Sequence, residues 1–266
     1  MNILEEIIAF KSKELARSRS LMPAQTLERS TLFSRTTFSL RSFLLAPNAS
    51  GIIAEFKRLS PSKGIINRTA TPADVTRAYT ENGASALSVL TDSHFFGGSA
   101  DDLSQARSNL IPILRKDFII DEYQVLEAKA MGADVVLLIA ACLSPRRTLE
   151  LASLARQLHM EVLLEVHHEG ELNHICDAID HVGVNNRNLK TFSVDMRKSF
   201  ELAELIPAGK IRIAESGINT VDRVLEFRNA GFSGFLIGEH FMRERDPGKA
   251  FSDFIEKLRT KQKSTL

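Results

Sequence analysis

The sequence of 266 residues is poor in cysteine, and its charges nearly cancel. Its two cysteines, Cys142 and Cys176, form no CxxC pair, so we expect neither a disulfide framework nor a cysteine zinc site. The 34 Lys and Arg residues against 33 Asp and Glu residues leave a net charge of +1, whereas binding to a phosphate backbone needs a concentrated basic excess. These shortages predict an intracellular, cytoplasmic protein with no nucleic-acid partner.

Long hydrophobic runs are also lacking. The longest covers residues 135–143, which is nine residues, and a membrane-spanning helix needs about 20. At the N-terminus, Ile3, Leu4, Ile7 and Ile8 share one helical stripe, but acidic residues at 5 and 6 interrupt it in a way that targeting peptides avoid. We therefore expect no membrane partner, and we expect a structural helix over residues 2–18.

One pattern recurs from residue 51 onward: a short apolar run, a polar loop, an amphipathic helix and a glycine. In the unit that starts at Thr71, this residue is a helix cap, Pro72 suits the first turn, and Gly83 ends the helix. Successive runs begin about 26 residues apart, the length of one strand, two loops and a helix. The runs that predict buried strands cover residues 52–56, 87–90, 113–114, 135–139, 162–164, 182–184, 211–214 and 235–237.

Eight such units predict an α/β protein with a closed parallel (β/α)8 TIM barrel. An open doubly wound sheet is the alternative, but no GxGxxG turn follows the first run. About 50 residues precede the first strand, with a second apolar segment at 38–45. Because no linker composition marks a boundary, we expect one domain over residues 1–266, with a helical extension at 1–50 and the barrel at 51–266.

Charged side chains concentrate at the predicted strand ends, where a barrel of this kind carries its active site. Glu55 and Lys57 are two positions apart on one strand and so face the same way, with Lys116 and Glu165 opposite them. Any one of these residues could equally form an interior ion pair or lie in solvent. Together they predict acid–base chemistry, in which burial and like charges lower the pKa of lysine and raise that of glutamate toward neutrality.

The loops after the last two predicted strands carry a second group of candidates. Gly217 and Gly238 directly follow these strands, Ser216 lies beside the first, and loops at these positions often bind phosphate. We therefore expect a phosphorylated small-molecule substrate. His240 could contact this phosphate loop or simply pack.

Two further groups are less specific. Phe95 and Phe96, followed by two glycines, predict a flap that would suit an aromatic substrate. His167, His168 and His174 have no carboxylate spacing that completes a metal set, so we expect them on the surface or in loops.

Taken in order, the motifs at these positions closely resemble the indole-3-glycerol phosphate synthase family along nearly the whole chain. They are IIAEFKRLSPSKG, SVLTDSHFFGGS, ILRKDFIIDEYQV, LLEVH, VGVNNRNL, IAESGI and FLIGEHFM. The resemblance implies an enzyme of tryptophan biosynthesis that closes the ring of 1-(2-carboxyphenylamino)-1-deoxyribulose 5-phosphate, with loss of carbon dioxide and water and with no cofactor or metal. It also implies that the N-terminal helices cover the active-site face.

The resemblance further implies a role for each matching residue. Lys116 protonates the ketone oxygen, Glu165 stabilises the developing cation or acts as a base, and Glu55 and Lys57 serve dehydration and substrate binding. Asn185 and Ser216 assist them. The implied substrate-binding residues are Ser60, Phe95, Phe96, Phe118, Arg187, Gly217, Leu236, Gly238 and Glu239. We expect a monomer, and association with other enzymes of the pathway stays open.

Two other functions compete with this one. Phosphoribosylanthranilate isomerase would share the phosphate loops, but resemblance to it would imply a Cys and Asp acid–base pair. The first predicted strand here has no such pair. A non-catalytic binder of a phosphorylated ligand would need only the glycine loops. It would have no use for Glu55, Lys57, Lys116 and Glu165, and all four are present.

Overall fold

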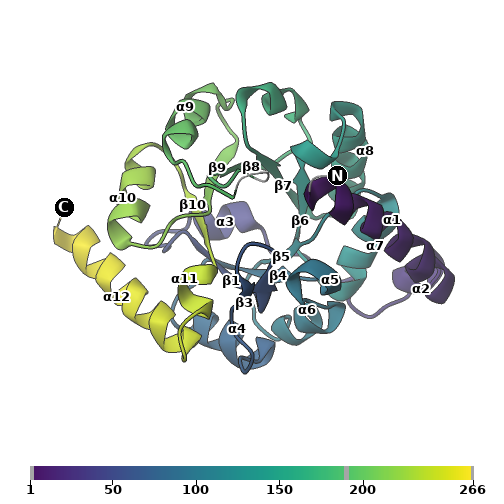
Figure 1. Cartoon of the computed structure of the whole chain (residues 1–266), viewed down its shortest axis with the longest axis horizontal. Coiled ribbons are helices and arrows are strands. Elements are labelled where there is room, and N and C mark those ends of the chain that lie inside the picture. Colours follow the sequence, from purple (N-terminus) through teal and green to yellow (C-terminus); the bar gives the residue numbers. More distant parts are fainter. Residues whose placement is uncertain (1–2, 189–191, 265–266) are drawn as a thin grey trace.

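The computed structural model describes residues 3–188 and 192–264, and a closed barrel of eight parallel strands lies at its centre (Figure 1). Each barrel strand pairs with the next one along the chain, and the last pairs with the first. This confirms the predicted (β/α)8 barrel. The barrel strands are β1 (Ile52–Phe56), β4 (Ala86–Leu90), β5 (Ile113–Lys116), β6 (Val135–Ile139), β7 (Glu161–Val166), β8 (His181–Asn185), β9 (Ile211–Glu215) and β10 (Gly234–Ile237).

Helices follow the strands and surround the barrel (Figure 1). The larger ones are α4 (Pro72–Glu81), α6 (Ala100–Ala106), α7 (Glu122–Met131), α8 (Pro145–Gln157), α9 (Arg197–Leu205), α10 (Val221–Asn229) and α12 (Pro247–Ser264). The loops add β2 (Leu59–Ser60), β3 (Gly64–Ile65), α5 (Ser93–Phe96), α11 (Glu239–Met242) and the 3-10 turns η1 (Ala140–Cys142) and η2 (Glu169–His174). Thr71 caps α4 as predicted, and its side chain accepts a hydrogen bond from the Asp74 amide.

Alternation along the strands separates two cores. On β1, Ile52, Ala54 and Phe56 pack outward against the helices, whereas Ile53 belongs to the cluster inside the barrel. Because side chains alternate with a period of two, the positions after Ile53 that point inward are 55 and 57. The barrel interior is therefore apolar in its middle and becomes charged toward the carboxyl ends of the strands.

The N-terminal segment contacts both ends of the barrel. Helix α1 (Ile3–Leu21) lies across the end formed by the carboxyl ends of the strands (Figure 1), and α2 (Ala24–Glu28) packs against α7. Helix α3 (Leu40–Leu44) closes the opposite end, where Leu40 and Leu44 join the interior cluster. The predicted helix over 2–18 thus runs further than expected, to residue 21, and residue 2 lies outside the described residues.

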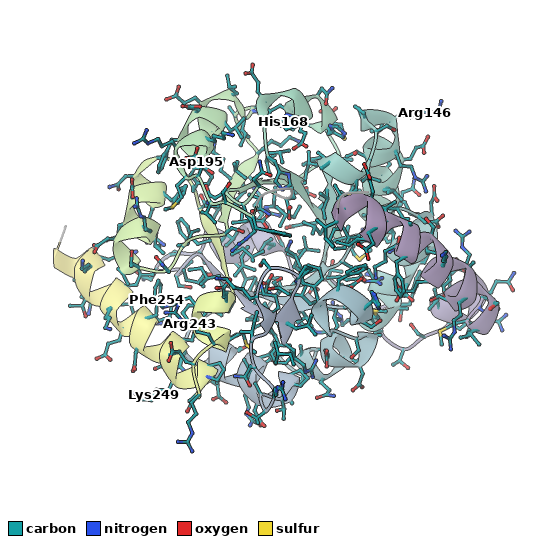
Figure 2. The ribbon with its side chains drawn as sticks, in the orientation of Figure 1. Arg146, His168, Asp195, Arg243, Lys249 and Phe254 are labelled. Atoms are coloured by element: carbon teal, nitrogen blue, oxygen red, sulfur yellow. The ribbon has the colours of Figure 1, made fainter. Side chains whose placement is uncertain are left out.

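Other charged side chains lie on the outer helices. Arg146 and Lys249, for example, project away from the barrel (Figure 2). Among the residues that the structure describes, no helix is both long and apolar enough to cross a membrane.

Candidate active site

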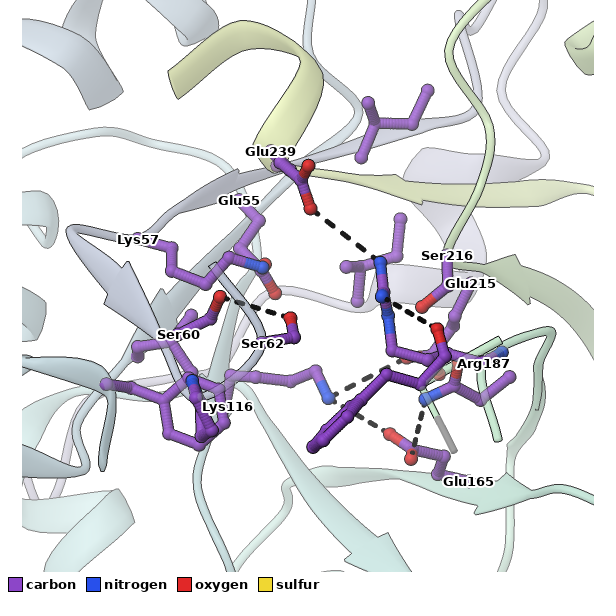
Figure 3. Close-up of a pocket in the computed structure, with 18 of the residues that line it drawn as sticks. Glu55, Lys57, Ser60, Ser62, Lys116, Glu165, Arg187, Glu215, Ser216 and Glu239 are labelled. Carbon is purple, nitrogen blue, oxygen red and sulfur yellow. Dashed lines mark hydrogen bonds and ion pairs between the residues drawn. The ribbon is translucent and has the colours of Figure 1, made fainter. Parts of the chain in front are cut away.

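The carboxyl ends of all eight barrel strands border a cavity of about 270 Å³, and α1 forms part of its wall. Four of the charged residues that line it occupy inward-facing positions on the strands. Each follows an interior apolar residue of its own strand by two positions: Glu55 after Ile53, Lys116 after Leu114, Glu165 after Leu163 and Glu215 after Ile213. The strand period therefore brings these side chains into one space (Figure 3).

Glu55 and Lys57 lie side by side on β1, as predicted. The Nζ atom of Lys57 donates a 2.7 Å hydrogen bond to Oε1 of Glu55, and the hydroxyl of Ser88 lies 3.3 Å from Oε2. Glu55 is buried and Lys57 is only partly exposed. This pair is a proton donor and a proton acceptor in direct contact.

Lys116 forms a second group with two carboxylates. Its Nζ atom donates to Oε2 of Glu165 at 3.0 Å and lies 3.7 Å from Oε2 of Glu215. Asn185 donates from its side-chain amide to the other oxygen of Glu165 at 2.9 Å. Two buried carboxylates thus share one ammonium group (Figure 3).

The pKa values of this group split in a way that the sequence did not predict. Burial opposes the charge on Lys116, but Glu165, Glu215 and Glu55 outweigh it and hold the pKa of Lys116 above its ordinary value. Burial likewise opposes the charge on Glu165, but Lys116, His167 and Asn185 hold the pKa of Glu165 below its ordinary value. The expected shifts toward neutrality are therefore wrong for both residues, because each neighbours an opposite charge.

Glu215 is the carboxyl group whose pKa does rise. Burial and the adjacent Glu165 raise it to about 8, and the attraction of Lys116 offsets only part of that rise. At neutral pH the site therefore holds an ionised Glu165 and a protonated Glu215 around one lysine. Glu215 is not among the site residues predicted from the sequence, although its position two residues after Ile213 on β9 makes it inward-facing.

His167 lies in the loop directly after β7, as one of the two predicted placements has it, but it is not on the surface and it belongs to this site. Its side chain is 11% exposed, with Nε2 3.2 Å from Oε1 of Glu165 and Nδ1 3.5 Å from Oε2 of Glu171. Burial opposes protonation, but the two glutamates outweigh it and raise the pKa of His167 to about 10. His174 is buried as well, whereas His168 is exposed as predicted.

The glycine loops after β9 and β10 also line the cavity, and the second lies beside Glu55. Gly238 directly precedes α11, and a Cβ atom there would come within 2.7 Å of Oε1 of Glu55. Ser216 and Gly217 both have positive φ and both line the cavity, so a tight turn follows β9 at this point. Arg187 lies 3.7 Å from the carboxylate of Glu239 (Figure 3). Lys63 lies 3.7 Å from the same carboxylate.

The remaining wall of the cavity is apolar. It comes from Ile3, Leu4 and Ile7 of α1 together with Phe96 and Phe118, whose rings lie 6.1 Å apart. Phe95 does not line the cavity. It is buried and packs against Phe10 instead, with ring centroids 5.7 Å apart.

The cavity therefore collects nearly all of the predicted site residues. Those that line it are Glu55, Lys57, Ser60, Phe96, Lys116, Phe118, Glu165, Asn185, Arg187, Ser216, Gly217, Leu236, Gly238 and Glu239. His240 lines it too and also packs edge-on against Phe241 and Phe254. In the described part of the chain, no group of three or more His, Cys, Asp or Glu side chains could hold a metal ion.

A closed barrel with lysine and glutamate side chains meeting at its strand ends, opposite glycine loops, defines a (β/α)8-barrel enzyme. The family model of indole-3-glycerol phosphate synthase matches residues 4–254. The chain is 47% identical to an indole-3-glycerol phosphate synthase of Bacteroides thetaiotaomicron, with 97% of this chain and 99% of that one covered. It is 45% identical to one of Laribacter hongkongensis, with 94% and 98% covered.

The chain belongs to the indole-3-glycerol phosphate synthase family, whose members are carboxy-lyases of tryptophan biosynthesis. Among solved structures, KGPDC from Streptococcus mutans is similar in fold, with a TM-score of 0.57 at 14% identity over 78% of this chain and 98% of that one. This likeness concerns the barrel alone.

Proposed function

We propose that this chain converts 1-(2-carboxyphenylamino)-1-deoxyribulose 5-phosphate into indole-3-glycerol phosphate, carbon dioxide and water. The observation that carries the proposal is the meeting of Lys116, Glu165 and Glu215 with the Glu55–Lys57 pair around one cavity. Membership of the family supports the same reaction.

Ring closure requires a proton donor at the ketone. The ring carbon that bears the carboxylate attacks the ketone carbon, and the carbonyl electron pair takes a proton to become a hydroxyl group. We assign this proton to Lys116, because the carboxylates around it keep it protonated at neutral pH. Glu165 stays ionised beside it, so it stabilises the positive charge that develops on the substrate nitrogen and ring.

Loss of carbon dioxide then returns an electron pair to the ring. The hydroxyl group leaves as water after gaining a proton, and a base removes a proton from the carbon next to nitrogen, which forms the indole double bond. Glu55 and Lys57 supply a base and an acid in contact for this step. Glu215 carries a proton at neutral pH and offers a second acid.

Substrate binding is assigned to the two ends of the cavity. The apolar wall suits the aromatic ring. We assign phosphate binding to the backbone at Gly217, Gly238 and Glu239 and substrate binding to Arg187 and Ser60, all of which line the cavity. Phosphate bound at one end orients the chain for folding onto the ring.

Fluorescence of the indole product tests the proposal. Purified protein with the carboxyphenylamino substrate should develop this signal at the same rate with and without a chelator. Absence of the signal would rule out the reaction, and sensitivity to the chelator would rule out a metal-free mechanism. The expectations of one domain, a monomer, a cytoplasmic location and possible association with other tryptophan-pathway enzymes stay predictions.

A further inference from the structure

A lysine of α1 is buried between two aspartates at the edge of the cavity. Lys11 is 2% exposed, and its Nζ atom lies 2.9 Å from Oδ2 of Asp92 and 2.9 Å from Oδ1 of Asp117. Glu14, one turn further along α1, lies 2.7 Å from the same Nζ atom. Both aspartates are themselves buried, so this ion cluster is shielded from solvent.

Each aspartate also holds a part of the cavity wall. Oδ1 of Asp92 accepts hydrogen bonds from the amides of Phe95 and Phe96 at 2.7 and 3.2 Å, which caps α5. Asp117 directly follows Lys116, and its Oδ1 atom accepts a 2.8 Å hydrogen bond from the Phe118 amide. Lys11 therefore joins α1 to the two loops that carry the aromatic wall.

The spacing along α1 connects this cluster to the cavity. Ile3, Ile7 and Lys11 are four residues apart, so they lie on one face of the helix. Ile3 and Ile7 line the cavity and Lys11 lies next in the row. The helix face that lines the cavity is therefore the face that carries the buried ammonium group.

Stability alone does not account for a buried cluster of this kind. Taking charges out of water is costly, and well-packed apolar side chains of similar volume often stabilise a fold at least as well. A lysine between two fixed carboxylates, by contrast, specifies a single docked position for the helix that carries it.

We propose that Lys11 is a positioning residue for the reaction above, on which this inference rests: its charge seats α1 as a wall of the substrate cavity. Lys11 acts through Asp92 and Asp117 and does not line the cavity itself. Asp117 also contacts Thr91 and Arg115, so we expect Lys116 to stay in place when Lys11 is changed. Loss of the charge should therefore weaken binding more than it slows the chemical steps.

The test compares Lys11→Met, which keeps an unbranched side chain without the charge, with Lys11→Arg and with Lys13→Met. Lys13 is exposed on the same helix and serves as the matched control. Hydrogen exchange of the α1 amides, measured without substrate, reports docking independently of activity. Steady-state kinetics on the same variants separate KM from kcat.

We expect Lys11→Met to speed exchange in residues 3–21 about tenfold or more while exchange in β6 stays unchanged. KM should rise about tenfold with kcat within about threefold of the starting value, as for loss of uniform binding. Lys11→Arg should recover part of both effects, and Lys13→Met should show neither.

Unchanged α1 exchange and unchanged KM in Lys11→Met would overturn the inference, as would faster exchange spread evenly over the barrel. If Lys11→Met does not fold, Asp92→Asn removes one of the two buried acceptor charges and keeps an oxygen to cap α5. That variant should also speed α1 exchange, and unchanged exchange would count against the inference. If the unaltered protein makes no indole product, the proposed function fails, and the exchange comparison still decides whether Lys11 docks α1.

Discussion

Gly183 on β8 lies directly against the carboxylate of Glu215 on β9, so closely that a methyl group at 183 would collide with Oε1 of Glu215. The missing side chain at 183 makes room inside the barrel for a second carboxylate beside Lys116. A glycine in the interior of a strand, ordinarily unfavourable, is therefore explained by the side chain that occupies its place.

The change Gly183→Ala should displace Glu215 and lower kcat by about ten- to a hundredfold, since small misplacements in a site are costly. Kinetics of indole formation measure the loss, and circular dichroism checks that the fold is retained. In a Glu215→Ala background the same change should lower kcat by a further factor of less than about two, because the colliding carboxylate is gone. Equal losses in both backgrounds would contradict the steric explanation.

Replacing Lys116 removes the proposed acid. Lys116→Ala should lower turnover by about two orders of magnitude or more, the range for loss of a positioned proton donor, while substrate still binds. Stopped-flow fluorescence and equilibrium binding separate the two effects. Lys249→Ala, on the outside of α12, is the control and should leave both unchanged. A normal rate in Lys116→Ala would exclude Lys116 from the chemistry.

The raised pKa of Glu215 makes the stability of the fold depend on pH. The folded protein keeps this proton up to about pH 8, whereas an unfolded glutamate loses it near its ordinary pKa of 4.5. Between these values the folded state binds more protons, so the free energy of unfolding should fall as pH rises, by at most about 1.4 kcal/mol per pH unit.

Glu215→Gln should remove this contribution. Urea denaturation at several pH values between 5 and 8.5 measures the slope for each protein, with the exposed Glu201→Gln as control. The Glu215→Gln protein should lose less stability than the starting protein as pH rises. Parallel slopes would show that Glu215 is ionised in the folded state.

His167 supplies positive charge to Glu165 at Oε1, the carboxylate oxygen that Lys116 does not contact. His167→Asn should raise the pKa of Glu165 and move the acidic limb of the kcat profile to higher pH, because a cation that favours the carboxylate is removed. His168→Asn alters an exposed histidine next in the chain and should leave the profile unchanged. Identical profiles for the two variants would refute the pairing.

Glu239 places a carboxylate where an anionic group of the substrate is expected. It lies 3.7 Å from both Lys63 and Arg187 and is partly exposed. Glu239→Gln should therefore lower KM by about two- to fivefold, the size of a surface charge effect, with kcat unchanged. The gain should shrink in high salt. Glu226→Gln, in an exposed pair on α10, should have no effect, and a higher KM in Glu239→Gln would show that the carboxylate assists binding.

The barrel could be predicted from the sequence because it depends on local pattern. Apolar runs about 26 residues apart, helix caps such as Thr71 and helix-ending glycines all act over short distances. The period of two also placed Glu55 and Lys57 together correctly, since it needs no knowledge of other strands.

Side-chain contacts between different elements could not be predicted in the same way. The direction of the pKa shift of Glu165 depends on Lys116, which is remote in sequence, and on His167, which was expected on the surface or in a loop. The pKa shift of Glu215 depends on Glu165, which is also remote in sequence. Phe95 illustrates the same difficulty, because its partner Phe10 lies on the N-terminal helix. Such contacts are set by three-dimensional packing, and no residue spacing in the sequence indicates them.

The position of α3 at the closed end of the barrel has a consequence for folding during translation. Leu40 and Leu44 leave the ribosome before any of the strands whose interior they fill, and Gly234, which packs against Leu44, is among the last barrel residues to appear. The nascent segment must therefore wait, without its partners, until the ring of strands is complete. Helix α3 is thus synthesised before the barrel whose end it closes.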